Sequence, residues 1–493
     1  MTTTENRAGP RTYGNWRKAK GFGIGNLTTR QSLVLFAAIA LPILLVQVSA
    51  QAALVVAVPA VVAVGMTVVP LGDTTAGEII MRRLRFWSAR YNGETELASG
   101  VLTDHPRAQD LPGVMAPVVP VDSPDGQGGA QGLLWDRRSG ALTAIFKVSP
   151  VGVDLADERQ ADTWVASWGA FLAQLGYQPL VKHIAITIDT APSGGTSVAE
   201  YVHGRIDPNA PQLARDVLEE LVARTPARSA DAQSRVAVTF NPSRANPRPE
   251  NLFAAVAEVT RWLPGLESSL SGVGATVLGR ASVSEIISWL RVAYDPASRG
   301  EVTRTSIEDA LLEWGDAGPV RASEHWDNWR HDSGVSVSWG LSEAPRQAVT
   351  SRVLVPLLSP GPYPRRMTML YEPFSAHAAA EQVEAEINNN RVRTAWAQRT
   401  KRDQTQREVD DQARAVQAAR EEAQGAGVGR FSLFVTTTVL DDKHLPSAEA
   451  DVVQRAGLCK LRLRRLSGAQ SAGFAAGLGM GINPAELARR RAR

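Results

Sequence analysis

A long run without any charged residue dominates the hydrophobic pattern of the N-terminal part. The 42 residues from 31 to 72 are uncharged, and most of them are Ala, Val, Leu or Ile. One helix of that length would measure roughly 63 Å, twice the ~30 Å hydrocarbon core of a bilayer. The polar break Ser49-Ala50-Gln51 divides the run. We therefore expect two transmembrane helices, at 32–48 and 52–69, which form a hairpin.

Basic residues on both sides of this run predict its orientation. They precede and follow the hairpin, whereas the connecting turn has none. The positive-inside rule then places both termini in the cytoplasm of a two-span inner-membrane protein. A cleaved signal peptide ending at Val48-Ser49-Ala50 is the rival interpretation, and a buried hairpin in a soluble protein is a third. The basic residues are Arg7, Arg11, Arg17, Lys18, Lys20, Arg30, Arg82, Arg83, Arg85 and Arg90.

The two segments after the apolar run, 78–87 and 103–131, differ in the spacing of their apolar residues. Apolar residues at 79, 80, 84 and 87 recur at helical spacing with arginines between them, which predicts an amphipathic helix over 78–87. It could lie along the inner membrane surface or be an ordinary surface helix. Residues 103–131 are rich in Pro, Gly and Asp and show no clean period, which predicts a linker.

From Gly132 onward, segments of strand and helix period alternate. Residues 133–136 and 142–148 flank Gly140 and predict a hairpin. The other predicted strands are 181–188, 234–240, 275–278, 335–339, 352–357, 367–371, 431–440 and 458–466. The predicted helices are 157–175, 212–223, 249–262, 282–292, 375–424 and 448–457. This alternation indicates an α+β protein in which an α/β sandwich is built on a mainly antiparallel sheet.

These patterns predict the following organisation. A cytoplasmic leader (1–31) precedes the transmembrane hairpin (32–71), a juxtamembrane amphipathic helix (72–102) and the linker (103–130). A first cytoplasmic α/β domain (131–360) follows, and then a part that combines one long helix with a second α/β unit (361–493). The long helix is polar on all sides over 398–408, as expected where a helix crosses solvent, breaks or meets a partner.

The charge balance and the cysteine count argue against several classes of function. Lys plus Arg number 53 and Asp plus Glu 50, and a net charge of +3 does not indicate direct nucleic-acid binding. Cys459 is the single cysteine, so an intrachain disulfide and metal sites with several cysteines are excluded. Hydrophobic residues make up 44% and charged residues 21%, which is typical of a globular protein.

The candidate chemical motifs are incomplete. Residues 274–281 have the glycine spacing of a phosphate loop, but Arg280 and Ala281 stand where Lys and Ser/Thr are needed. Asp441-Asp442 ends a hydrophobic strand, where we expect a solvated turn rather than a Mg²⁺ site. The glycines of 425–429 predict a helix end, and those of 477–481 a flexible segment.

The sequence contains seven histidines. They are His105, His183, His203, His325, His331, His377 and His444. None has the i, i+4 spacing that places two imidazoles on one helix face, and no Gly-x-Ser-x-Gly motif occurs. We therefore expect no catalytic residue, no cofactor site and no metal site.

Two stretches resemble parts of one machine. The N-terminal part resembles the PrgI-type membrane protein of conjugative type IV secretion systems. The resemblance is carried by Phe22-Gly23-Ile24-Gly25-Asn26-Leu27 to Gln31, by the two apolar spans and by Arg90-Tyr91-Asn92-Gly93. Residues 130–485 resemble the N-terminal, non-motor region of VirB/TrbE/CagE-type secretion ATPases. This second resemblance is carried by 278–290 up to Asp295-Pro296, by the long polar helix, and by 461–470 up to Gly481.

The resemblance implies a membrane-anchored, non-catalytic component of a type IV-like secretion or conjugation apparatus. In those ATPases the motor domain follows a segment like 477–481, and the family's catalytic residues have no counterpart here. The implied partners are the lipid bilayer, a separate motor ATPase and other subunits of an oligomeric complex. The Ala-, Val- and Arg-rich composition looks actinobacterial and would also suit a two-span subunit of a type VII secretion system. A membrane-tethered enzyme is the alternative from a different class.

Overall fold

The structure is a computed structural model. It describes residues 29–491, apart from 48, 72–73, 100–108, 151, 153–155, 193–205, 208–209, 225–229, 305–311, 376, 383, 386–387 and 389–426. Most of the predicted long helix, and most of the PrgI-like motif before Arg30, therefore lie outside the described residues.

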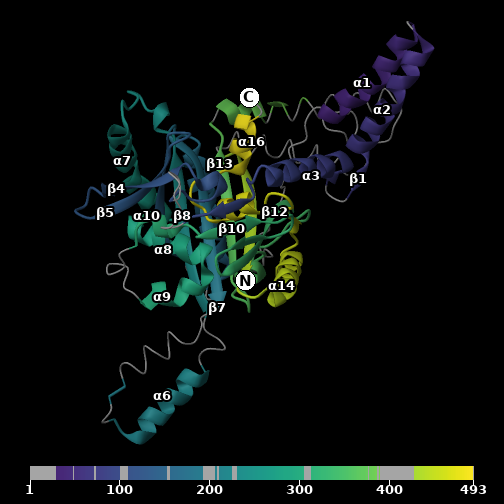
Figure 1. The fold of residues 1–493 in the computed structure, drawn as a ribbon. Coiled ribbons are helices and arrows are strands. Elements are labelled where there is room, and N and C mark those ends of the chain that lie inside the picture. The colour runs from purple at the N-terminus through teal and green to yellow at the C-terminus, as the bar shows by residue number, and fades with distance from the viewer. Residues whose placement is uncertain are drawn as a thin grey trace, which may run out of the picture.

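One antiparallel sheet of 13 strands organises the body of the protein (Figure 1). Its strands lie side by side in the order β3-β10-β11-β12-β14-β13-β7-β8-β6-β5-β4, and β9 and β15 pair with β6 and β12. The strand bounds are β3 Glu96–Ala98, β4 Val118–Pro124, β5 Ala130–Asp136, β6 Ala141–Pro150, β7 Val181–Pro192, β8 Ala230–Phe240, β9 Ala275–Arg280, β10 Arg321–Glu324, β11 Trp329–His331, β12 Gly334–Glu343, β13 Arg365–Pro373, β14 Gly429–Val439 and β15 Arg462–Arg465.

Helices connect and cover these strands. Their bounds are α1 Thr29–Val46, α2 Ala50–Val68, α3 Ala76–Tyr91, α4 Glu158–Leu175, α6 Gln212–Arg224, α7 Leu252–Ser271, α8 Val283–Tyr294, α9 Arg299–Arg304, α10 Trp314–Ala317, α11 Val355–Leu358, α14 Leu445–Leu458, α15 Gln470–Gly477 and α16 Pro484–Arg491. A separate two-stranded ribbon, β1 Pro70–Leu71 and β2 Thr74–Thr75, joins α2 to α3.

The sheet consists of two halves with the same topology. From its centre outward, one half has the order β7-β8-β6-β5-β4 and the other has the order β13-β14-β12-β11-β10. Helices occupy equivalent places along the chain: α4 and α11 precede the central strands, α7 and α14 precede the edge strands β9 and β15, and α8 and α15 follow them. Antiparallel pairing of β7 with β13 joins the halves, with Thr187 opposite Thr368. We call this pair of strands the seam.

Alternation along the strands produces a core on each face of the sheet. In β6, Leu142 and Phe146 pack in one cluster with residues of α4 and α7, whereas Ile145 packs in another with residues of α8 and α15. α14 packs against the second half through Val452, next to Val435 of β14. Each large side chain buried in this way contributes roughly 1.5–3 kcal/mol. Helices therefore cover both faces of the sheet.

The N-terminal hairpin requires a correction. α1 and α2 form at the predicted positions and are separated by the break at Ser49, but the transmembrane prediction is wrong. Of the helices that the structure describes, none is both long and apolar enough to cross a bilayer. The predicted two-span membrane location is contradicted by the same finding.

Two other segments also differ from prediction. Residues 352–357 form a turn and α11 rather than a strand, because Pro356 stands in the first turn of the helix, where a missing N–H has no cost. Within the segment that we predicted as a linker, residues 118–124 form β4 and Met115 is fully buried. The other predicted strands and helices of 132–292 and 335–466 form wherever the structure describes them, with two large shifts of bounds. The helix predicted at 249–262 extends to Ser271, and the strand predicted at 458–466 is confined to 462–465.

Candidate functional site

The phosphate-loop look-alike forms an edge strand. Residues 275–280 are β9, which pairs with β6, and the strand ends where Ser282 caps α8. Arg280 donates to the carbonyl of Asp125 at 2.8 Å and pairs with Glu267 at 3.2 Å. The Glu285 carboxylate already occupies the N-terminus of α8, as part of a capping box. Both the guanidinium and the helix N-terminus therefore have structural partners.

A row of hydroxyl pairs crosses the sheet on the face covered by α15. Thr143 pairs with Thr239 at 2.9 Å, Thr187 with Thr368 at 3.0 Å, and Ser338 with Thr436 at 2.9 Å, all between oxygen atoms. The row therefore runs from β6 through the seam to β12. Because each buried hydroxyl has a partner, it avoids the desolvation cost of an unpaired polar group.

The glycine-rich segment 477–481 lies directly over this row. Thr368 donates to the Gly477 carbonyl. Gly479 and Gly481 have φ angles of +69° and +84°, and a Cβ at either position would overlap the hydroxyl of Thr187 or Thr143. Glycine is needed here for conformation and for close approach. We call residues 470–483 the strap, because it crosses both halves of the sheet.

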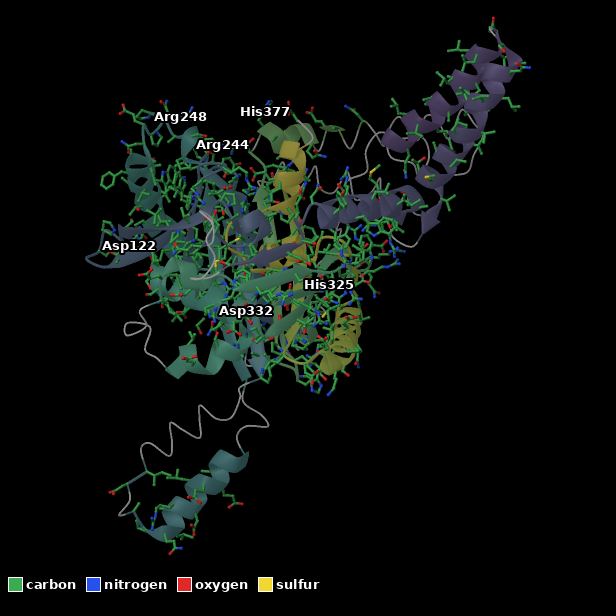
Figure 2. All side chains as sticks on the ribbon, in the orientation of Figure 1. Asp122, Arg244, Arg248, His325, Asp332 and His377 are labelled. Atoms are coloured by element: carbon green, nitrogen blue, oxygen red, sulfur yellow. The ribbon has the colours of Figure 1, made fainter. Side chains whose placement is uncertain are left out.

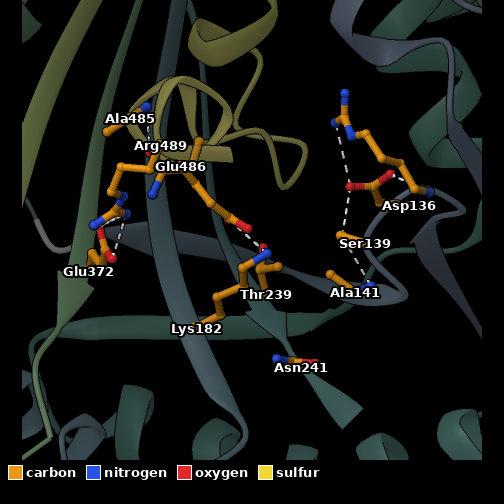
Figure 3. A network of polar contacts seen from close by, with 12 residues as sticks. Asp136, Ser139, Ala141, Lys182, Thr239, Asn241, Glu372, Ala485, Glu486 and Arg489 are labelled. Carbon is orange, nitrogen blue, oxygen red and sulfur yellow. Dashed lines mark hydrogen bonds and ion pairs between the residues drawn. The ribbon is translucent and has the colours of Figure 1, made fainter. Parts of the chain in front are cut away.

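α16 anchors the end of the strap (Figure 3). Arg489 donates to both carboxylate oxygens of Glu372, at 2.8 and 2.9 Å, and Lys182 pairs with Glu486 at 2.7 Å. The first contact reaches the end of β13 and the second the start of β7, so α16 spans the seam. Both hydrogen bonds of Arg489 come from its Nη2 atom, and a contact between two charged groups is stronger than one between neutral groups.

A buried charge cluster lies at the seam on the strap face. Asp189 accepts from Arg366 Nε at 2.9 Å and lies 3.7 Å from Arg299. Arg235 donates to the Leu478 carbonyl at 3.0 Å. Burial would raise the pKa of Asp189, but the neighbouring arginines outweigh it and hold that pKa below its usual value. Burial and the charge of Arg366 lower the pKa of Arg235 to about 10.

Three arginines thus lie around the Asp189 carboxylate. Arg235 Nε and Arg366 Nη1 are buried and have no hydrogen-bond partner within the described chain. We did not single out these residues from the sequence. The sequence feature that could have indicated them is a charged residue within an otherwise apolar strand, such as Arg235 in Ser234-Arg235-Val236.

Two of the histidines, His183 and His331, are buried in the body of the protein. His331 contacts the Tyr294 carbonyl through Nδ1 and Ser336 through Nε2, at 2.5 and 2.7 Å. Burial lowers the pKa of His331 to about 4. Burial and the charge of Lys182 lower the pKa of His183 to about 4 as well. Both imidazoles are therefore neutral at pH 7.

The other candidate residues lie apart from one another. His325 and His377 lie at the surface, as Figure 2 shows, and His444 precedes α14. Asp441 caps a short helix by accepting from the Lys443 N–H, and Asp442 pairs with Arg330. His105, His203 and most of 425–429 lie outside the described residues. In the part of the chain that the structure describes, no His, Cys, Asp and Glu side chains gather as a metal-binding group.

Exposed apolar side chains gather on elements that project from the body. α6 lies away from the sheet in Figure 1 and exposes Leu213, Val217, Leu218 and Leu221 on one side. α1 and α2 expose many more. The exposed apolar residues of α1 and α2 are Leu33, Phe36, Ile39, Leu41, Ile43, Leu44, Val46, Leu54, Val55, Val58, Val61, Val62 and Met66. Contiguous apolar surface of this kind marks interaction sites.

Comparisons with known proteins do not identify the chain. No model of a known protein family matches it, and a search of curated proteins finds no match. The resemblance to secretion proteins therefore stays a prediction.

Proposed function

We propose that this protein is a non-catalytic structural component of a type IV-like secretion or conjugation apparatus, and that it docks a separate motor ATPase. The family resemblance of residues 130–485 suggests the machine. The projecting helix α6 carries the docking proposal. Its exposed leucines and valine, Leu213, Val217 and Leu221, follow one another at intervals of four residues. Such a stripe fits a hydrophobic groove on a partner.

The contacts of the ionisable groups support a structural role. Arg280, which stands where a phosphate loop has its lysine, is held by Asp125, Gln131 and Glu267. Phosphoryl transfer needs a free cation at that place and a metal-binding hydroxyl beside it. Residue 281 is a buried alanine, which cannot supply the hydroxyl.

The proposal is tested by purifying the tagged full-length protein from its own host. We expect an ATPase with an intact phosphate loop to co-purify, and the complex to reform from the two purified proteins. The isolated chain should not bind ATP. Failure to recover any such ATPase would contradict the docking half of the proposal, and micromolar ATP binding by the isolated chain would contradict the non-catalytic half.

A matched pair of variants locates the contact. Leu213→Asp with Leu221→Asp places two charges on the apolar stripe of α6, and each should be unfavourable in a groove. Val453→Asp is the control, because Val453 is a similarly exposed apolar residue in the middle of α14. We expect the α6 variant to lose the ATPase and the control to retain it. Equal recovery with both variants would exclude α6 as the docking element.

A further inference from the structure

The helix α3 is held against the body of the protein by one of its sides (Figure 1). Phe86 is buried, and its ring meets the ring of Trp326 edge to face, with 5.5 Å between the centroids. The guanidinium of Arg83 lies over the same indole, 5.2 Å from its centroid. At the start of the helix, the Thr75 hydroxyl accepts from the Glu78 N–H. These contacts determine which side of α3 faces outward.

The outward side of α3 carries a stripe of large apolar residues. Ile80, Leu84, Trp87 and Tyr91 follow one another at intervals of four, three and four residues, which aligns them along one face of a helix. Their exposed fractions are 45%, 53%, 63% and 93%. A surface helix of a globular protein needs only one apolar face, the one that packs on the core. A second apolar face, directed outward, indicates a binding surface.

The flanks of this stripe are basic. α3 contains Arg82, Arg83, Arg85 and Arg90, and its acidic residue is Glu78. At about 100° per residue, Arg83 and Arg90 lie roughly 70–90° to one side of the stripe, Arg85 roughly 130° to the other side, and Glu78 roughly opposite the stripe. The side chains of Arg83, Arg85 and Arg90 are exposed. Positive charge therefore borders the apolar stripe on both sides.

An anionic lipid surface complements both the stripe and its flanks. Trp and Tyr side chains are favoured at the boundary between headgroups and acyl chains, where the ring is in apolar surroundings and the polar group meets water. Arginines beside them attract anionic headgroups and can reach these while the helix lies flat. A helix in this position lies within the interface, so the contact needs no helix that crosses the bilayer.

We infer that α3 binds along the surface of an anionic lipid bilayer, with its apolar stripe at the acyl chains and its exposed arginines at the phosphates. The inference is independent of the motor ATPase proposed above, because vesicle binding is measured with the purified chain alone.

The first test uses a polarity-sensitive dye on the full-length protein. Ser88→Cys places the dye at the edge of the stripe, and Ser271→Cys places it at the exposed end of α7. The native Cys459 is buried, and the wild-type protein controls for its labelling. With vesicles of phosphatidylcholine and about one third phosphatidylglycerol, we expect blue-shifted emission from position 88 and unchanged emission from position 271. Phosphatidylcholine alone should bind at least about tenfold more weakly.

A matched pair of variants tests the apolar stripe by flotation of the unlabelled protein with the same vesicles. Leu84→Asp with Trp87→Asp should weaken binding by about tenfold or more, because two charges would enter the acyl region. Phe253→Asp with Leu278→Asp changes exposed apolar residues of α7 and β9, and should leave binding within about twofold. Circular dichroism checks that both variants are folded.

A second pair tests the charges. Arg85→Gln with Arg90→Gln removes two positive charges from the flanks of the stripe and should weaken vesicle binding by about tenfold or more. Arg244→Gln with Arg248→Gln removes the same charge from another exposed surface, labelled in Figure 2, and should leave binding within about twofold.

Four results would overturn the inference. Equal shifts of emission at positions 88 and 271 would indicate adsorption without a defined site. Vesicle binding without a shift at position 88 would place the contact on another part of the chain. Equal binding to both lipid compositions would remove the role of the arginines. Absence of vesicle binding, with loss of a co-purifying protein from Leu84→Asp with Trp87→Asp, would make the stripe a protein interface, and absence of vesicle binding alone would exclude the lipid surface.

Discussion

The two halves of the sheet share a topology but differ in the chemistry of their edge strands. β9 and β15 occupy equivalent positions, each paired with the third strand of its half and each preceded by a helix, α7 or α14. In β9, Arg280 is 7% exposed and has three polar partners. In β15, Arg462 and Arg464 are exposed. The shared topology therefore fixes where these strands lie, and their side chains differ in burial.

The seam between the halves shows the opposite arrangement. There Asp189 and Arg366 are buried and paired, Arg235 donates to a carbonyl of the strap, and the hydroxyls face one another beneath it. We expect substitutions at the seam to act on folding and substitutions at α6 to act on binding. The following predictions test that division.

The largest effect is expected at the buried charge cluster. Asp189→Asn removes the carboxylate that pairs with Arg366 and lies beside Arg235 and Arg299, and should lower the free energy of unfolding by about 3–5 kcal/mol. Asp442→Asn removes an exposed partner of Arg330 and should change it by no more than about 1 kcal/mol. Urea unfolding measures both. Similar values for the two variants would contradict the distinction between seam and surface.

The next largest effect is expected in the strap. Gly479→Ala introduces a Cβ that overlaps the Thr187 hydroxyl at a φ of +69°, which should destabilise the fold by about 2–4 kcal/mol. Gly265→Ala lies within α7 and meets open space, so it should be neutral or stabilise by up to about 1 kcal/mol. Thermal unfolding of both variants provides the comparison. A tolerated alanine at 479 would show that the strap does not pack closely on the sheet.

The buried histidines predict a pH dependence. The pKa values of His183 and His331 are about 4 in the folded protein and 6.5 in the unfolded chain, so below pH 6.5 the unfolded state binds more protons. Stability should be full above pH 6.5 and fall progressively toward pH 4, by about 2 kcal/mol for each histidine at pH 5. Denaturant midpoints between pH 7.5 and 4.5 measure it. His331→Gln should flatten the profile by about half, and an unchanged slope would rule out this source.

The smallest effect on stability compares the edge strands directly. Arg280→Gln removes contacts of a nearly buried side chain and should cost about 1–3 kcal/mol. Arg464→Gln changes an exposed residue and should alter stability by less than about 0.5 kcal/mol, or even stabilise by removing repulsion of Arg82. Equal losses would mean that the arginines of β15 contribute as much to the fold as Arg280 of β9.

Local patterns in the sequence predicted most of the elements of the body. Period-two alternation in 181–188 and 234–240 marked the central strands, and Asp157 and Ser282 cap α4 and α8 near the predicted starts. The pattern failed at 352–357, where apolar residues cover a turn and a short helix. It also predicted transmembrane helices at 32–48 and 52–69. The helices form there, but a charge-free run does not by itself show that a helical hairpin crosses a bilayer.

Long-range arrangements could not be predicted in this way. The two-fold topology rests on pairings such as β6 with β8 and β12 with β14, which depend on segments roughly a hundred residues apart and leave no local period. The strap shows the same limitation. Its glycines looked like a flexible segment, and their role became apparent only when Thr187 and Thr143 were found beneath them. The charge cluster at Asp189 is likewise assembled from three strands and a helix.

The central proposal is that the chain docks a separate motor ATPase through the projecting helix α6. The most direct measurement is calorimetric titration of the purified full-length protein with the purified ATPase that it recovers. We expect saturable binding of the wild-type protein and of Val453→Asp, and binding at least roughly tenfold weaker for Leu213→Asp with Leu221→Asp. No heat of binding with the wild-type protein, or the same affinity for all three proteins, would contradict the account.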